Sequence, residues 1–351
     1  MDRVLEGKRI AICAGPGGVG KTTTSAAVAA GMAMRGLKVA VVTIDPARRL
    51  ADALGLDGLE DQPRRVDPAL FPGMQGELWA LMLDSKRTFD GLIAKVAPDE
   101  RARDDVLGNR IYQELSSAVA GSQEFTAIAK LYELDASGAF DLLVLDTPPS
   151  RNALDFLDAP DRLTAFLQGR AIRLFLRPGR VLGVGTGVVF SALRKATGVA
   201  LLDDLSTFFR ALGDMIPELA ERGRHVKALL ASEATVFLLV TSLEREPVDE
   251  TVFFHERLGE RGLPFGAVVV NKVRPPVGED GPLSPPLEPG LAARVAEAAA
   301  EASVLAARDA EGLERLRTAL GDPTVIAVPQ LPGDVHDLDG LAHVGEHLFG
   351  A

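Results

Sequence analysis

The sequence predicts an α/β fold, in which a doubly wound and mostly parallel sheet carries an inserted helical subdomain. Seven short runs are continuously apolar, which is typical of strands buried on both faces of a sheet. Segments that suit helices separate most of these runs, and this repeated strand, helix, strand order favours parallel neighbours. The predicted strands are 8–14, 38–44, 77–83, 141–146, 235–241, 265–271 and 324–328.

The bulk composition is that of a globular protein. Of 351 residues, 47% are hydrophobic and 25% are charged, which excludes a disordered or collagen-like chain. The length permits one large domain with an insertion or two smaller domains, and we interpret residues 1–351 as a single domain. We expect helical insertions at 84–133 and 150–232 to form the subdomain, because neither stretch contains a convincing strand.

The remaining segments are expected to be helices and connectors. Residues 21–36 and 243–262 lie between predicted strands and suit helices, and 291–320 is rich in alanine, glutamate and arginine, which favour a helix. Prolines and glycines concentrate in 274–290, which predicts a surface loop. The uncharged, glycine-rich stretch 181–193 is interpreted as a mobile connector or an apolar surface, and it is too short to span a bilayer.

The net charge and the hydropathy of the sequence limit the classes of partner that we expect. The formal net charge of −11 argues against nucleic acid, because it repels the phosphate backbone. The most basic stretch, 162–180, spaces its arginines as on the flank of an apolar helix. With no signal peptide and no uncharged apolar run of about 18 residues, we expect a cytoplasmic protein without direct membrane insertion. Cys13 is the single cysteine and is expected to be buried.

The stretch 15-GPGGVGKTT-23 matches the phosphate-binding pattern G-x-x-x-x-G-K-[ST]. It lies between a predicted strand and a predicted helix, which is the context that the motif requires. Backbone N–H groups and the helix N-terminus would bind phosphate oxygens, Lys21 the β- and γ-phosphates and Thr22 a Mg²⁺ ion. The sequence therefore predicts a P-loop nucleoside triphosphatase. Its predicted phosphate contacts are Gly15, Gly17, Gly18, Val19, Gly20, Lys21, Thr22 and Thr23.

Two aspartates are expected at the same edge of the sheet, because each ends a predicted strand and ligands bind at the carboxyl ends of parallel strands. Asp146 can hold Mg²⁺ through water. Asp45 can act with Lys21 in catalysis, by orienting or deprotonating the attacking water, and belongs with Thr22 and Asp146 to the predicted metal site. Asp45 can also cap a helix that begins at Pro46, and both roles can hold together.

Together, the glycine loop, 45-DPARRLADAL-54 and 146-DTPPSRNALDFL-157 resemble the ArsA anion-pump ATPases and the tail-anchored-protein targeting ATPases. These proteins belong to the deviant Walker A group, which also contains ParA and MinD. The resemblance implies ATP as the nucleotide, switch I at 45–54 and switch II at 146–157. Weaker similarity covers 121-GSQEF-125 and the residues that would contact adenine. Those residues are Asn271, Pro329, Leu331 and Pro332.

Two departures from the family pattern bear on the partners. Members of the group usually carry a lysine after the first loop glycine, which reaches the partner's nucleotide across a dimer. This chain has Pro16 there, with neither charge nor donor. The resemblance therefore implies a homodimer without these lysines, or a heterodimer with a lysine-bearing paralogue. Because Cys13 is the only cysteine, neither arsenite held by several thiolates nor a bridging zinc held by cysteine pairs is possible.

The leading hypothesis is a Mg²⁺-dependent, dimeric ATPase switch, whose helical insertions bind an apolar client or a partner. Those insertions can equally be a packed subdomain without a client. The alternative is a non-hydrolysing ATP-binding subunit of a heterodimer, which Pro16 favours and which Asp45 and Asp146 disfavour. A ParA-like DNA ATPase or a MinD-like membrane ATPase is disfavoured by the acidic charge and by a C-terminal segment, 338–351, without lysine or arginine.

Overall fold

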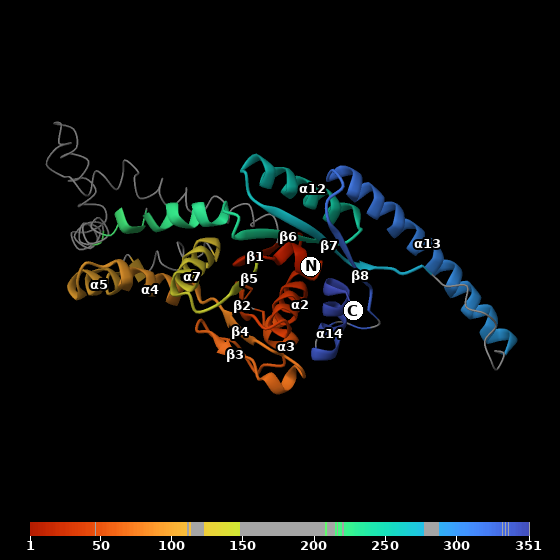
Figure 1. Ribbon diagram of the computed structural model, residues 1–351, viewed down its shortest axis with the longest axis horizontal. Helices are drawn as coiled ribbons and strands as arrows, with labels where there is room; N and C mark the ends of the chain where they lie inside the picture. The colour runs from red at the N-terminus through yellow and green to blue at the C-terminus, as the bar shows by residue number, and fades with distance from the viewer. Residues whose placement is uncertain are drawn as a thin grey trace, which may run out of the picture.

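The protein folds around one eight-stranded sheet with the strand order β3-β4-β2-β5-β1-β6-β7-β8. All strands pair in parallel except β3, which is antiparallel to β4. Figure 1 shows helices on both faces of the sheet, so the predicted doubly wound α/β fold is confirmed. The computed structural model describes residues 1–45, 47–110, 112–113, 123–147, 208, 215, 217–219, 221–276, 288–331, 333, 335 and 337–350.

Seven of the eight strands coincide with the seven predicted runs: β6 has the predicted bounds, and the other six differ from the prediction by one or two residues at an end. The eighth, β3, was not predicted because its two residues are charged and exposed and carry no apolar signal. The strands are β1 (Ile10–Ala14), β2 (Lys38–Thr43), β3 (Arg64–Arg65), β4 (Glu77–Met82), β5 (Leu142–Asp146), β6 (Thr235–Thr241), β7 (Phe265–Val273) and β8 (Val325–Pro329).

Three helices, α2, α12 and α13, confirm the predicted helices at 21–36, 243–262 and 291–320. Aspartates cap α4, α5 and α14, because each accepts a hydrogen bond from a backbone N–H in the first turn. The helices are α1 (Asp2–Leu5), α2 (Lys21–Met34), α3 (Arg49–Ala53), the 3-10 helix η1 (Pro68–Leu70), α4 (Ser85–Val96), α5 (Glu100–Leu107), α7 (Gln123–Ser137), α12 (Arg245–Glu260), α13 (Pro289–Ala319) and α14 (Leu338–Phe349).

The described part of the predicted insertion at 84–133 consists of helices and the short connectors between them. It holds α4, α5 and the first part of α7, and α7 contacts both α4 and β5. In Figure 1, α4 and α5 extend away from the strands. Of the second insertion, the described residues include a helical stretch at 221–230, whereas 162–180 and 181–193 lie outside them. The division into a core and a helical subdomain stays a prediction.

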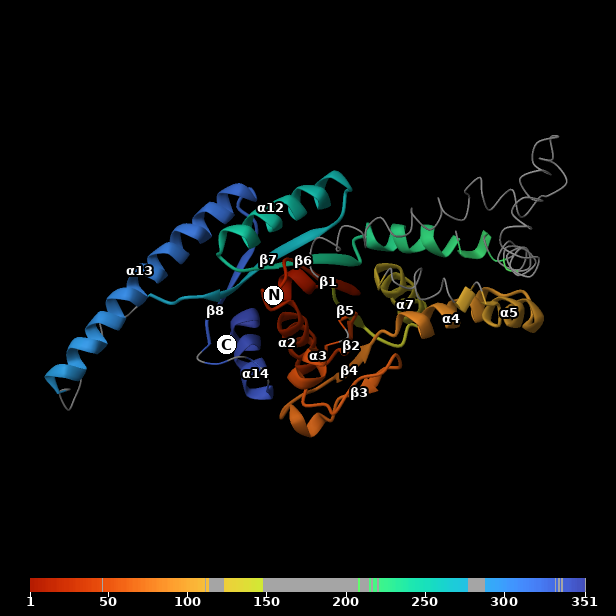
Figure 2. The same ribbon diagram turned by 180° about the vertical axis from the view of Figure 1, so that it is seen from behind.

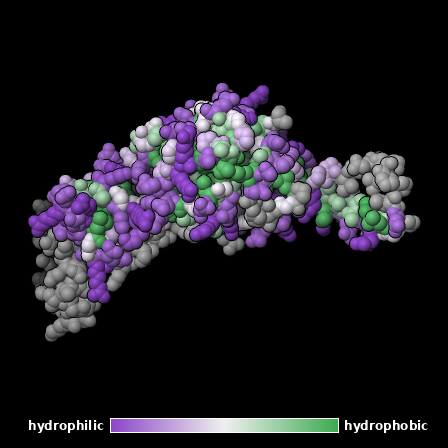
Figure 3. Space-filling model, turned by 90° about the horizontal axis from the view of Figure 1, so that it is seen from below, coloured by the Kyte–Doolittle hydropathy of each residue, from purple (hydrophilic) through white to green (hydrophobic). Residues whose placement is uncertain are grey.

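Helix α13 is 31 residues long, and only its C-terminal part packs on the body. There, Asp309 is buried and accepts hydrogen bonds from the backbone N–H of Arg274, at 2.8 Å, and from its Nη1 atom, at 3.1 Å. Residues 290–298 are all exposed. Figures 1 and 2 show this part projecting as an arm at one end of the molecule, and Figure 3 shows apolar residues in green on it.

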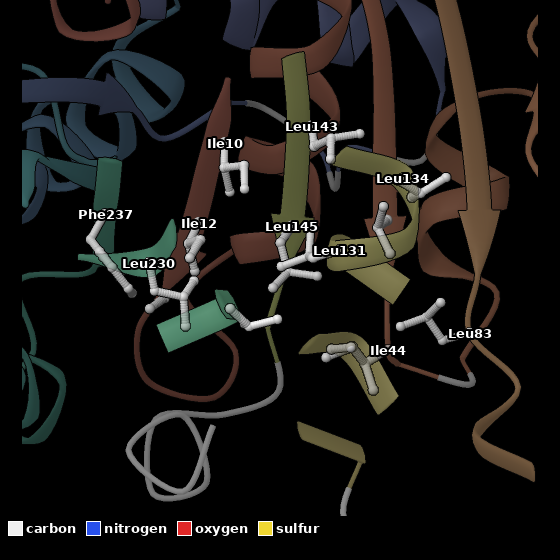
Figure 4. Packing of buried hydrophobic residues seen from close by; sticks show 14 of the residues in the cluster. Ile10, Ile12, Ile44, Leu83, Leu131, Leu134, Leu143, Leu145, Leu230 and Phe237 are labelled. Atoms are coloured by element: carbon white, nitrogen blue, oxygen red, sulfur yellow. The ribbon is translucent and has the colours of Figure 1, made fainter. Parts of the chain in front are cut away.

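The two faces of the sheet carry separate hydrophobic cores. On one face, alternate strand residues such as Ala11 and Val41 pack against α2, α3 and α14. On the other face, strand residues pack against α4, α7, α12 and the C-terminal part of α13. Figure 4 shows how residues of β1 and β5 meet residues of α7 in this second core; those labelled there include Ile10, Ile12, Leu131, Leu134, Leu143 and Leu145.

Helix α14 uses its apolar face inside the fold. Leu341, Val344 and Leu348 are buried. A Cβ on Gly31 of α2 would lie 2.1 Å from the Phe349 ring, so the two helices pack closely where glycine leaves room. The apolar face of this C-terminal segment therefore packs on α2. None of the described helices combines the length and the apolar character that crossing a bilayer requires.

Two adjacent phenylalanines of α12 allow the packing of that helix to be tested. We expect Phe254→Ala to lower the free energy of unfolding by about 3–5 kcal/mol, because this side chain is 1% exposed in the core. Phe253→Ala is the matched control, since Phe253 is 47% exposed and the Arg257 guanidinium lies 5.1 Å from its ring centroid. Its loss should stay below about 1 kcal/mol in urea unfolding. Equal losses would contradict this packing.

Candidate functional site

The glycine loop leaves β1 and enters α2 at the middle of the sheet. Strand β1 lies between β5 and β6, where the chain diverges toward opposite edges of the sheet, and open α/β sheets bind ligands at such points. Gly18 and Gly20 have φ angles of 77° and 93°, in the left-handed region that favours glycine. A Cβ on Gly15 would lie 2.0 Å from the Val240 carbonyl oxygen, so only glycine fits against β6 there.

The loop offers free donors to an anion. Within the described residues, the N–H groups of 17–20 donate to no backbone carbonyl. The first N–H groups of α2 likewise have no preceding helical turn to bind. Gly17 and Gly18 are exposed, so a ligand can reach the loop from solvent. These donors and the positive end of the α2 dipole suit phosphate oxygens, as the sequence predicts for this stretch.

Lys21 lies inside the loop rather than extending into solvent. Its side chain is buried, and its Nζ atom donates a hydrogen bond of 2.7 Å to the carbonyl oxygen of Pro16. Burial lowers the pKa of Lys21, and the nearby carboxylates of Asp146 and Asp45 oppose that shift. The ammonium group is therefore held against the backbone of the loop at Pro16.

Asp146 is the most deeply buried charged group of the site, at 2% exposure. Its Oδ2 atom accepts hydrogen bonds from Thr22 Oγ1 at 2.7 Å and from Thr43 Oγ1 at 2.9 Å, whereas its buried Oδ1 atom has no hydrogen-bond partner among the residues that the structure describes. Burial raises the pKa of Asp146 to about 6, although both threonines and Lys21 act to lower it. An unpartnered carboxylate oxygen beside a threonine hydroxyl fits Mg²⁺, which prefers oxygen ligands.

Asp45 lies beside the loop but does not cap a helix. Helix α3 begins at Arg49, with Arg48 at its N-cap, so the prediction of a helix start at Pro46 is wrong. Instead, Asp45 Oδ1 accepts a hydrogen bond of 2.9 Å from the N–H of Ala47, which closes a tight turn. Its Oδ2 atom lies 3.4 Å from the Nη1 atom of the exposed Arg49. The catalytic and metal roles of Asp45 stay predictions.

Thr43 is a site residue that sequence reasoning missed. Its hydroxyl donates to Asp146 and accepts a hydrogen bond of 3.2 Å from the N–H of Asp45, so it connects the two aspartates. The strand register places Thr43 directly beside Asp146. A polar residue near the end of an apolar run, two positions before a candidate aspartate, was the available signal.

The end of β7 braces the glycine loop through two neighbouring side chains. Asn271 Nδ2 donates to the Val19 carbonyl oxygen at 2.9 Å, and Lys272 Nζ donates to the Gly18 carbonyl oxygen at 3.1 Å. Lys272, which was not predicted as a site residue, has a φ of 61°, a conformation that costs energy for any residue other than glycine. A Cβ on Gly20 would lie 2.2 Å from Asn271 Nδ2, so this contact requires glycine.

The described residues among the predicted adenine contacts lie on, or just after, the neighbouring strands β7 and β8. Asn271 is near the carboxyl end of β7, Pro329 ends the adjacent β8, and Leu331 follows it, partly buried against the core. Pro332 lies outside the described residues. So do switch II after Thr147 and residues 121–122 of the GSQEF segment, together with the side chains of 123–125. The adenine contacts therefore stay predictions.

Cys13 follows its predicted place in the core. It is fully buried in β1, and this burial raises the pKa of its thiol to about 12. The thiol is therefore neutral and shielded from solvent.

Residues 8–282 match the family model described as anion-transporting ATPase. The chain is 28% identical to the ATPase ASNA1 homolog of Babesia bovis, over 74% of this chain and 64% of the relative. It is 26% identical to ATPase get3 of Aspergillus terreus, over 74% and 71%. It is 27% identical to the putative arsenical pump-driving ATPase 1 of Aquifex aeolicus, over 76% and 64%. The chain thus spans less than two thirds of the first and third relatives.

Replacing Asp146 with asparagine should remove part of the dependence of the protein's stability on pH. The folded-state pKa of about 6 exceeds the unfolded value of about 4, so the folded state binds more protons between these values and loses stability as pH rises through this window. We expect Asp146→Asn to be more stable than wild type at pH 8 by up to roughly 3 kcal/mol, and by less at pH 5, in urea unfolding with EDTA.

Asp57→Asn is the matched control for this measurement, because Asp57 is exposed. It should follow the wild-type stability at both pH values. A stability difference between Asp146→Asn and wild type that is the same at pH 5 and pH 8 would contradict the raised pKa.

Proposed function

Because the chain belongs to the anion-transporting ATPase family, we propose that it binds ATP with Mg²⁺ at the glycine loop and hydrolyses ATP to ADP and phosphate. The observation that carries the proposal is the convergence of three side chains at the carboxyl edge of the sheet, Lys21 inside the loop and Thr22 bonded to Asp146. The three relatives named above are all ATPases by name, which supports the same activity.

Each residue of the loop has a distinct task in this proposal. The free N–H groups and the start of α2 bind the phosphates, and Lys21 exchanges the Pro16 carbonyl for β- and γ-phosphate oxygens. Thr22 Oγ1 and, through water, Asp146 hold the metal ion, which neutralises negative charge on the phosphates when it is bound. The unpartnered Oδ1 of Asp146 supplies an acceptor that needs no rearrangement of the core.

Asp45 orients the attacking water in this proposal. Its charge acts on the buried Lys21, which places its carboxylate near the loop. One oxygen holds the turn to Ala47 and the other has only a long, exposed contact to Arg49, so this second oxygen is free to accept a proton from water. The turn between Asp45 and α3 is short, and its rearrangement around the γ-phosphate would carry the nucleotide state to the rest of the chain.

We extend the proposal to a dimeric switch in the cytoplasm, in which nucleotide state controls a helical surface for an apolar client or partner. The support is the family membership and the helices α4 and α5, which extend beyond the sheet. The mechanical link would run through α7, which contacts both α4 and β5, the strand that ends at Asp146.

The alternative, a non-hydrolysing subunit of a heterodimer, has one observation in its favour. Pro16 is buried, and its carbonyl oxygen holds the Lys21 ammonium inside the loop. Because the proline ring carries no positive charge, this position offers no cation to a partner's phosphates. In such a heterodimer, a lysine-bearing paralogue would complete the site of this chain.

We expect Asp45→Asn to lower the turnover number for Mg·ATP by roughly 100-fold or more, because the side chain can no longer accept a proton. The affinity for ATP should change little, since Asp45 does not bind the phosphates. Asp52→Asn is the matched control, as Asp52 is exposed on α3 in the same segment. Phosphate release and nucleotide titration measure both quantities. Turnover unaffected by Asp45→Asn would contradict the catalytic role.

The two quaternary alternatives differ in how Pro16→Lys behaves. If the chain needs a lysine from a paralogue, wild type binds ATP but is inert, and Pro16→Lys raises turnover on the order of the 1,000-fold effect of a cation supplied in trans. Pro16→Ala separates loss of the ring from gain of the charge. If wild type alone turns over ATP and Pro16→Lys does not change the rate, the heterodimer alternative is contradicted and the chain is a self-sufficient ATPase.

A further inference from the structure

The buried residues of the C-terminal half of α13 form a stripe along one face of the helix, and this stripe continues onto the projecting N-terminal half. In the packed half, Ala306, Asp309 and Leu316 face the body and are buried. Steps of three and four residues lead from this stripe back along the helix through Ala302, Ala298, Val295 and Leu291, which share one face. Leu291 and Val295 are 48% and 43% exposed, so the apolar stripe runs on beyond its cover.

The two flanks of this open stripe differ in charge. One flank carries Arg294 and Glu301, one heptad apart, and neither forms an ion pair within the described part of the chain. The other flank carries Ala292 and Ala299 at the same spacing. A partner helix laid along the stripe therefore meets charges on one side only, and small residues that allow close approach on the other.

We propose that the open stripe of α13 is a self-complementary interface, which pairs antiparallel with α13 of a second copy of this chain. With a two-fold axis near residue 297, Leu291 lies opposite the partner's Ala302, and Val295 lies opposite the partner's Ala298, so each large side chain meets a small one. Arg294 then faces the partner's Glu301, and the two-fold axis repeats this pair. The interface uses no nucleotide and is additional to the proposed function.

The charge pattern selects this orientation. In a parallel pair, the charged flank of each helix would face the alanine flank of the other, and neither Arg294 nor Glu301 would find an opposite charge. In the antiparallel pair, the two charged flanks meet and both ion pairs form. The overlap covers about 12 residues, roughly 18 Å of helix, which is small for a stable interface, so the pairing is weak and a trapping experiment suits it.

The test is cross-linking of Ala298→Cys with a short bismaleimide, on the full chain without nucleotide. Cys13 is fully buried, so the introduced thiol is the reactive one among the described residues. We expect a covalent dimer from Ala298→Cys. Val304→Cys is the matched control, because Val304 is 60% exposed on the opposite side of the same helix, and it should give little dimer. Equal dimer from both variants, or none from Ala298→Cys, overturns the proposal.

Charge reversal then tests the orientation in the Ala298→Cys background at low salt. Arg294→Glu alone and Glu301→Arg alone each place like charges opposite one another, and each should lower the cross-linked fraction by about fivefold. Mixing these two variants restores both ion pairs, so a heterodimer should recover the original yield. A mixture that cross-links no better than either variant alone overturns the antiparallel pairing.

Discussion

The site depends on one buried carboxylate. A charge as enclosed as that of Asp146 is tolerated only where hydrogen bonds and a cation offset its lost hydration, and Thr22, Thr43 and Lys21 provide them. These partners come from the start of α2, the end of β2 and the glycine loop. The register of β5 with β1 and β2 brings them together, so the chemistry of the site depends on the pairing of the strands.

The sequence was sufficient for features that depend on local pattern. Continuous apolar runs gave seven strands because parallel strands are buried on both faces, and the glycine loop with Asp146 gave the centre of the site because each stands directly after such a run. By contrast, β3 is two exposed arginines without periodicity. The turn at Asp45 was misjudged because a proline after an aspartate suits a tight turn as well as a helix start.

The features that sequence reasoning missed depend on contacts between distant segments. Thr43 acts only because strand register sets it beside Asp146, more than a hundred residues away. Asn271 was singled out, but its contact with Val19 spans 252 residues and leaves no trace in local spacing. Lys272 owes its role to a left-handed backbone that lysine rarely adopts, and composition does not reveal such strain.

The anchor of the long helix and the brace of the glycine loop come from the same short segment of the chain. Arg274, which donates hydrogen bonds to Asp309, follows Asn271 by three residues. Asn271 in turn donates a hydrogen bond to the Val19 carbonyl oxygen of the loop. Leu291 lies 18 residues from Asp309, a span of about 27 Å in a helix. A rotation of about 5° at this anchor would therefore move the tip by roughly 2 Å. The length of α13 would therefore turn a small change of angle at Asp309 into a large displacement at Leu291.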